Sequence, residues 1–344
     1  MCNIAAYVGR FDAAPILIEM MRKEQGFNGG YYTGLVTLKN GKLGCEKLMG
    51  DLDYLLKNTP AAKLQGTAGL MHSRSNSKGG DEWAHPFVDE FNKEPEIAYV
   101  ANGNAGCCSD RRRQYSAIAE RLLSEGYEMY QLKDIQDKYI ELKDGSTVHM
   151  SDLMCQLILE YINKGYAADA AMEAAFCEMP SEIVGLMLKS DEPDRITFTR
   201  YNFPMFAGFA EHGAFLSSTP VAFPDDVTRV IPIPPMSYGC ITADELVIKP
   251  MKKPGITVSS VGETERRQIY DILINAMKDE ALVMSDLTDM VKPLFPPADC
   301  PEPLEVIHEI LYSLKKEDRI IFEERRLPGA REDLTAPKLY MKLK

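Results

Sequence analysis

A cysteine at the second position, followed at once by an apolar run, most constrains what this chain of 344 residues can be. Residues 3–8 predict a buried strand that starts directly after Cys2. If Met1 is removed, Cys2 carries a free α-amine and a thiol together, and the amine can take the thiol proton. The alternative is that Cys2 is a small buried residue of a first strand. With Met1 retained, the amine would be part of a peptide bond and could not act as a base.

The composition argues against several classes of protein. The net charge is −12, which argues against broad binding to nucleic acid or to anionic membranes. No apolar run approaches the roughly 20 residues of a transmembrane helix, and no signal peptide is evident. The eight cysteines have no CxxC spacing, so we expect no metal site, no disulfide framework and no cofactor. These features predict a cytoplasmic protein with reduced thiols.

Helix and strand patterns follow one another along the first 250 residues, which fits a layered fold of sheets and helices. Strands are predicted at 66–70, 96–100, 182–188, 195–199, 206–210, 214–218 and 237–248. Helices are predicted at 14–24, 111–127, 152–164 and 167–179, with Ser151 as the N-cap of the third. Four glycines within 26–35 predict tight turns, and the charged segment 130–149 is interpreted as an irregular insertion.

The predicted secondary structure changes near residue 250. Helices are predicted at 263–279, 285–291 and 304–316, and a hairpin is predicted from 319–322 and 338–343. Three helices followed by a two-stranded ribbon is the element order of a winged helix, and a helical appendage packed on the main domain or on a second subunit is the alternative. Residues 251–344 carry more acidic than basic side chains, so we expect protein contacts rather than DNA binding.

Two polar motifs stand at the ends of predicted strands. Arg74 lies just beyond the strand 66–70, and its planar guanidinium suits a carboxylate. Asn102 and Gly103 follow the strand 96–100, where an amide side chain and a backbone N–H can hold one oxyanion. The alternatives are a solvated loop and an ordinary turn.

Together these motifs resemble class II glutamine amidotransferases, in particular the glutaminase half of glutamine–fructose-6-phosphate aminotransferase. That family begins MCGIxGxVG where this chain begins MCNIAAYVG. Its HTRWATHGxP…NAHPH loop corresponds to HSRSNSKGG…EWAHPF, its HNG to ANG, and its LxxAR…SPLxxG…xxFxASD to ITFTRYNFPMFAGFAEHGAFLSSTP. The resemblance covers residues 1–250 and implies an α+β fold, the four-layer αββα sandwich of N-terminal-nucleophile (Ntn) hydrolases. A small winged-helix-like domain would follow at 251–344.

The resemblance also implies catalytic roles. Cys2 would attack the side-chain amide of glutamine with its own α-amine as the base, form a thioester and release ammonia. The Asn102 side chain and the Gly103 N–H would hold the oxyanion.

Four further residues would bind or surround the substrate. Arg74 would bind the substrate α-carboxylate, Ser77 would assist it, and His85 would lie beside the pocket in a structural role. Met150 stands where the family has the aspartate that binds the substrate α-amine, and Asp152 is the neighbouring candidate to replace it.

The departures from the family pattern leave the substrate open. The Gly-rich loop loses its Arg and Asp, and Ser75 and Lys78 replace a Trp and a His. The sequence predicts a glutaminase-type hydrolase for glutamine or a related small amide, with an ammonia-accepting synthase as a candidate partner and a homodimer as a candidate assembly. The alternatives are an Ntn amidase for another amide and a catalytically weak scaffold that binds an amino acid.

Overall fold

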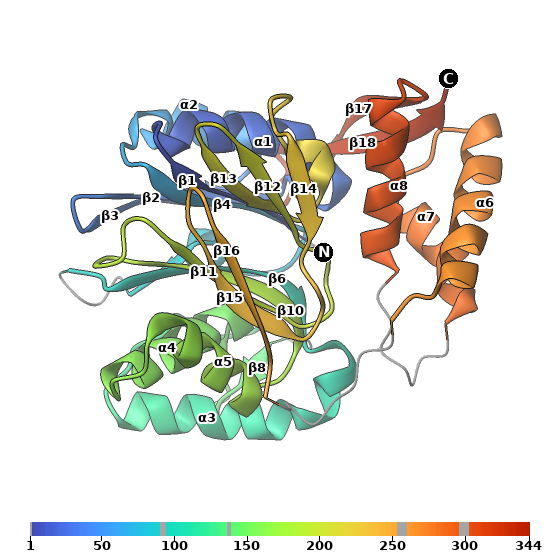
Figure 1. Ribbon diagram of the computed structural model, residues 1–344. Helices are drawn as coiled ribbons and strands as arrows, with labels where there is room; N and C mark the ends of the chain where they lie inside the picture. Colours follow the sequence, from blue (N-terminus) through green and yellow to red (C-terminus); the bar gives the residue numbers. More distant parts are fainter. Residues whose placement is uncertain (1, 90–93, 136–138, 253–259, 296–302) are drawn as a thin grey trace.

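Two β-sheets lie face to face between two layers of helices in the computed structural model (Figure 1). The structure describes residues 2–89, 94–135, 139–252, 260–295 and 303–344. The helices α1 (Ala13–Asn28) and α2 (Leu52–Asn58) cover one sheet, and α4 (Met150–Asn163) and α5 (Ala168–Glu178) cover the other. The helix α3 (Arg112–Ser124) packs against α4 on the outside. The chain is therefore of the α+β class, with helices outside and sheets inside.

The first sheet has seven strands in the order β14-β12-β13-β1-β4-β2-β3. Its strands are β1 (Asn3–Gly9), β2 (Tyr32–Lys39), β3 (Lys42–Met49), β4 (Ala68–Arg74), β12 (Phe206–Ala210), β13 (Gly213–Ser217) and β14 (Arg229–Pro232). The apolar run after Cys2 thus becomes a central strand, hydrogen-bonded to β13 on one side and to β4 on the other.

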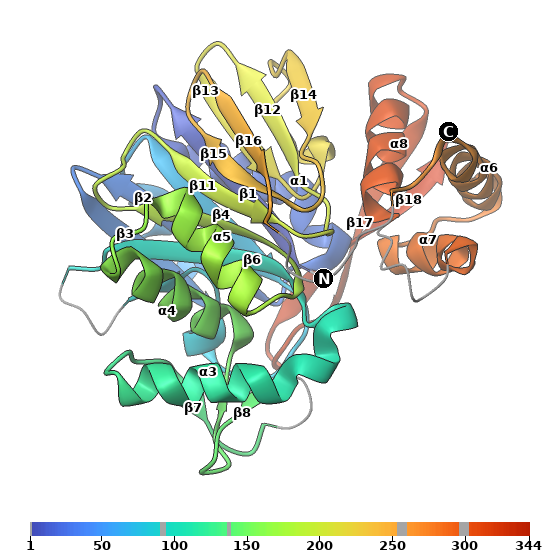
Figure 2. The same ribbon diagram turned by 60° about the horizontal axis from the view of Figure 1, so that its bottom comes forward.

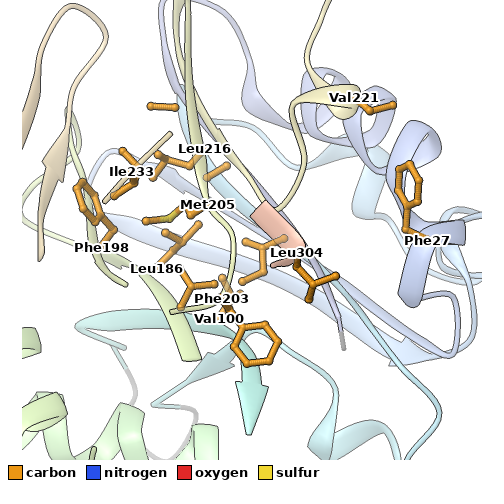
Figure 3. Packing of buried hydrophobic residues seen from close by; sticks show 14 of the residues in the cluster. Phe27, Val100, Leu186, Phe198, Phe203, Met205, Leu216, Val221, Ile233 and Leu304 are labelled. Atoms are coloured by element: carbon orange, nitrogen blue, oxygen red, sulfur yellow. The ribbon is translucent and has the colours of Figure 1, made fainter. Parts of the chain in front are cut away.

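The second sheet has six strands in the order β16-β15-β11-β10-β6-β5. Its strands are β5 (Phe87–Val88), β6 (Ile97–Asn104), β10 (Glu182–Lys189), β11 (Ile196–Arg200), β15 (Ser237–Ile241) and β16 (Leu246–Pro250). Apolar side chains of the two inner faces, including Val100, Leu186 and Leu216, fill the space between the sheets (Figure 3). This packing holds β1 and β6 against each other. Cys2 directly precedes β1, and β6 contains Asn102 and Gly103.

Several predicted boundaries are wrong. The predicted strand 237–248 is two strands, β15 and β16. Segment 130–149, of which residues 136–138 lie outside the described part, contains three two-residue strands, β7 (Gln131–Leu132), β8 (Ile140–Glu141) and β9 (Thr147–Val148), which form a small sheet that the sequence did not predict. Ser151 is not a helix cap, since α4 begins at Met150 and the His149 side chain accepts a hydrogen bond from the Ser151 N–H. Short 3₁₀ turns occupy Ala61–Lys63, Asp81–Trp83, Gly106–Arg111, Pro220–Ala222 and Lys292–Leu294.

The C-terminal segment packs beside α1 (Figure 2). It contains α6 (Glu263–Asp279), α7 (Met284–Val291), α8 (Leu304–Lys316), β17 (Ile320–Pro328) and β18 (Thr335–Leu343). The fully buried Phe27 ring meets His308 and Phe322 edge-on, with centroids 5.6 and 5.8 Å away. The Lys338 ammonium donates to the Phe27 carbonyl at 3.2 Å. One hydrophobic core therefore continues from the sheets into this segment.

Within the described part of the chain, helix length and apolarity nowhere reach what a membrane crossing requires.

Candidate active site

A pocket of about 200 Å³ opens beside Cys2, at the start of β1. It is lined by Cys2, Arg74, Ser75, Asn76, Ser77, His85, Ala101, Gly103, Asn104, Ala105, Tyr139, His149, Met150 and Ser151. Sites for drug-sized ligands measure roughly 300–1,000 Å³. The pocket is therefore suited to a small metabolite.

Strand register explains why residues far apart in sequence meet here. Ile4 pairs with His72 in the antiparallel ladder of β1 and β4, so continuing that register places Cys2 opposite Arg74 on the same face. His72 is the diagonal neighbour of Cys2 on this face. The strand β6 of the facing sheet ends at the same place and brings Gly103 to the pocket wall and Asn102 to the Cys2 backbone nitrogen.

The Cys2 backbone nitrogen and the Asn102 side chain form one unit. The Cys2 N–H donates to Asn102 Oδ1 at 2.8 Å. This bond orients the amide and leaves Nδ2 as the atom that can donate. Gly103 lines the pocket with φ of +134°, a conformation that favours glycine and sets the direction of the local backbone. The arrangement provides an acceptor for the amine and a candidate pair of donors for an oxyanion.

The Cys2 thiol is strongly perturbed. Burial raises its pKa, but the charge and hydrogen bond of the adjacent His72 imidazole lower it, so that the pKa falls to about 6. The Ser75 hydroxyl lies 3.9 Å from the sulfur. The sulfur is consequently a thiolate, the nucleophilic form, at neutral pH.

A cluster of imidazoles stands behind the thiol. His72 is fully buried, its Nε2 lies 3.0 Å from the Ala101 carbonyl oxygen, and its ring stacks on His85 with centroids 3.9 Å apart. The His149 ring meets the His85 ring edge-on at 5.3 Å. Burial holds the pKa values of His85 and His149 well below the usual range. Both rings are therefore neutral at pH 7.

We expect alkylation of Cys2 by iodoacetamide to reach half its maximal rate near pH 6 and to level off above it. Replacement of His72 by glutamine, whose Nε2 can keep the bond to the Ala101 carbonyl, removes the imidazole charge. The apparent pKa should then rise to about 8.5 or above, the ordinary range of a thiol. Peptide mapping of the adduct separates Cys2 from the other cysteines, and an unchanged pKa in His72→Gln would contradict the pairing.

Arg74 is buried, with 2% of its surface exposed. Its guanidinium donates to the Trp83 carbonyl at 3.1 Å, to the Lys78 carbonyl at 2.9 Å and to the Tyr139 hydroxyl at 2.6 Å. The group also lies over the Tyr32 ring, 4.5 Å from its centroid. These neutral partners hold the cation in the pocket wall. In the described part of the chain, no carboxylate forms an ion pair with it.

The structure brings together most of the predicted site residues. Ser77 lines the pocket, and its carbonyl accepts from the Tyr32 hydroxyl at 2.5 Å. His85 lines it as well. Asp152 is not among the lining residues, and its carboxylate accepts the Tyr130 N–H at 2.9 Å.

Sequence reasoning missed His72, Tyr139 and His149. His72 precedes Arg74 by two residues in one strand, so the alternation of a strand already placed it on the face of Cys2. Tyr139 and His149 come from the segment that was interpreted as an insertion, and no sequence signal marked them. Among the described residues, no His, Cys, Asp and Glu side chains are grouped as a metal ion requires.

No family model matches the chain. It is 25% identical over 260 residues to glutamine–fructose-6-phosphate aminotransferase of Chlorobaculum tepidum, covering 72% of this chain and 37% of that relative. The enzyme of the same name from Pyrococcus horikoshii is 23% identical over 271 residues, covering 77% of this chain and 40% of the relative. The chain thus spans about two fifths of the length of these relatives.

A solved structure shares the fold. The glutamine phosphoribosylpyrophosphate amidotransferase from B. subtilis, complexed with ADP and GMP, superposes with a TM-score of 0.60 at 15% identity. The match covers 81% of this chain and 59% of the other. The sequence relatives and this fold agree with the resemblance to class II glutamine amidotransferases that the motifs indicated.

Proposed function

We propose that this chain is an amide hydrolase of the class II glutamine amidotransferase type, with Cys2 as its N-terminal nucleophile. The observation that carries the proposal is the 2.8 Å bond from the Cys2 backbone nitrogen to Asn102 Oδ1. It holds the atom that becomes the α-amine next to the thiolate. Of the two candidate oxyanion donors, Gly103 lines the pocket, and Asn102 is joined to Cys2 by this bond.

The chemistry follows from these groups. Once Met1 is removed, the α-amine of Cys2 carries the proton as an ammonium beside the thiolate, and Sγ attacks the carbon of a primary carboxamide. Asn102 Nδ2 and the Gly103 N–H hold the oxyanion. The intermediate collapses as the ammonium returns its proton to the leaving nitrogen, which departs as ammonia. Water then attacks the thioester, releasing the carboxylic acid and restoring the thiol.

Arg74 and Ser77 are proposed to hold the carboxylate of the substrate, and His85 to shape the pocket as a neutral ring. Glutamine or a related small amide fits this set of groups. We propose that the released ammonia is consumed by an ammonia-accepting synthase, since the relatives in sequence are named as aminotransferases and are much longer than this chain.

We propose a division into an amidotransferase-like Ntn hydrolase domain at 1–250 and a winged-helix-like domain at 251–344. The order of α6, α7, α8, β17 and β18 supports the second assignment. Its excess of acidic residues favours a protein partner, a second copy of the chain included, over nucleic acid. A cytoplasmic location, where thiols stay reduced, suits the reactive Cys2.

Intact mass spectrometry tests the proposal. The protein is incubated with 6-diazo-5-oxo-L-norleucine or with 6-diazo-5-oxohexanoate, the same electrophile without its α-amine. We expect loss of Met1 and one adduct that maps to Cys2 with at least one of the two reagents. Retained Met1, or a processed Cys2 that reacts with neither reagent, would overturn the proposal.

A further inference from the structure

We infer that the pocket takes a small primary amide whose far end is a carboxylate and which carries no free ammonium group, in preference to L-glutamine. The inference rests on the proposed function, since it names the substrate class of the same Cys2 site. It follows from the charges around the pocket.

The pocket wall favours anions. Arg74 is buried, and its hydrogen bonds go to two carbonyls and a tyrosine hydroxyl, so its charge is not neutralised by those partners. The 14-residue helix α4 begins at the pocket with Met150 and Ser151, and the N-terminal end of a helix carries a partial positive charge. The cations that lower the pKa values of the neutral His85 and His149 include Arg74 and Lys47.

No described residue that lines the pocket carries a carboxylate. Nearby acidic side chains bind backbone N–H groups elsewhere. Asp152 accepts from Tyr130 at 2.9 Å, Asp81 from Met49 at 2.6 Å and Glu82 from Gly80 at 3.0 Å. None of these three lines the pocket.

The pocket should therefore bind a carboxylate more favourably than an α-ammonium group. A carboxylate beside Arg74 gains a charge-assisted hydrogen bond and supplies the missing counter-charge. An ammonium on the neighbouring carbon would lose water next to a guanidinium and a helix N-terminus. At the start of α4 the lining side chains offer it only neutral acceptors, the Ser151 hydroxyl and the Met150 thioether. Leaving a buried charge without a partner is costly, so the same amide without its amine should be the better substrate.

The test compares kcat/KM for ammonia release from glutaramate, L-glutamine and glutaramide, which differ only in the amine and the carboxylate. We expect glutaramate to exceed each of the others by about tenfold or more. Met150→Asp places a carboxylate at the start of α4 and should reverse the order of glutaramate and glutamine. Met150→Leu, the control of matched size, should keep the wild-type order.

Binding provides a readout without turnover. In the Cys2→Ala protein, calorimetry should find tighter binding of glutaramate than of L-glutamine. Glutamine as the preferred substrate and ligand of the wild-type site would overturn the inference while leaving the proposed function intact. Absence of ammonia release from every amide, together with an unlabelled Cys2, would overturn the proposed function and the inference with it.

Discussion

The Cys2→Ala protein is expected to lose amide hydrolysis by about 10⁴-fold or more, because no other group can form the thioester. The pocket should otherwise persist, since Cys2 precedes β1 and the strand is held by its pairing with β4 and β13. Ammonia release from glutaramate and from glutamine, followed with a coupled assay, measures the effect. Circular dichroism and thermal unfolding should match the wild-type protein.

Cys240→Ala is the matched control. Cys240 is a partly buried thiol in β15 of the other sheet, and burial raises its pKa rather than lowering it. Its removal should change the rate by less than about twofold, as for a substitution away from the site. Residual hydrolysis in Cys2→Ala, at a level near that of Cys240→Ala, would show that another group carries out the reaction.

The sheet framework could be predicted from sequence because its strands are short apolar runs between turn signals. The order of the motifs was the only sequence signal that placed four residues at one site: Cys2, Arg74, Asn102 and Gly103. The local sequence around each of them does not indicate that the two sheets meet there. The pairing of Ile4 with His72 supplies the missing step. It puts the His72 imidazole beside the thiol, a residue that the HSR motif contains but that had no predicted role.

The predicted end of the first helix was wrong because Gly26 was interpreted as part of a turn. The helix expected to end at residue 24 continues as α1 to Asn28, through Gly26. A Cβ at Gly26 would lie 2.7 Å from Leu339 Cγ, so glycine here allows β18 to approach the helix. The residue marks a packing contact with a segment more than 300 positions away, which local propensity does not register.

The role of the charged segment 130–149 in the site was not predicted from its sequence. The charged composition favoured an irregular insertion, yet β9 is buried, Tyr139 accepts a hydrogen bond from Arg74 and His149 caps α4. A segment whose polar residues form hydrogen bonds across an active site can have the same amino-acid composition as a loop exposed to solvent. Only the tertiary contacts distinguish them.

Asn102→Asp is expected to reduce kcat by about 10²–10³-fold, the usual effect of losing one oxyanion donor. Aspartate keeps an oxygen that can accept from the Cys2 nitrogen, now 2.8 Å from Oδ1. It removes the Nδ2 donor and places a negative charge where the oxyanion develops. KM should change much less than kcat, because the donor acts mainly in the transition state. Asn102→Ala should be at least as slow, because it also releases the amine.

Asn76→Ala separates the oxyanion role from a general effect of altering the pocket. Asn76 lines the same pocket but is exposed, so its removal should leave kcat within about threefold. Iodoacetamide should still label Cys2 in the Asn102→Asp protein, since the thiolate depends on His72 rather than on the amide. A kcat for Asn102→Asp close to that of Asn76→Ala would remove Asn102 from the oxyanion hole. The 2.8 Å bond would then serve only to position the Cys2 amine.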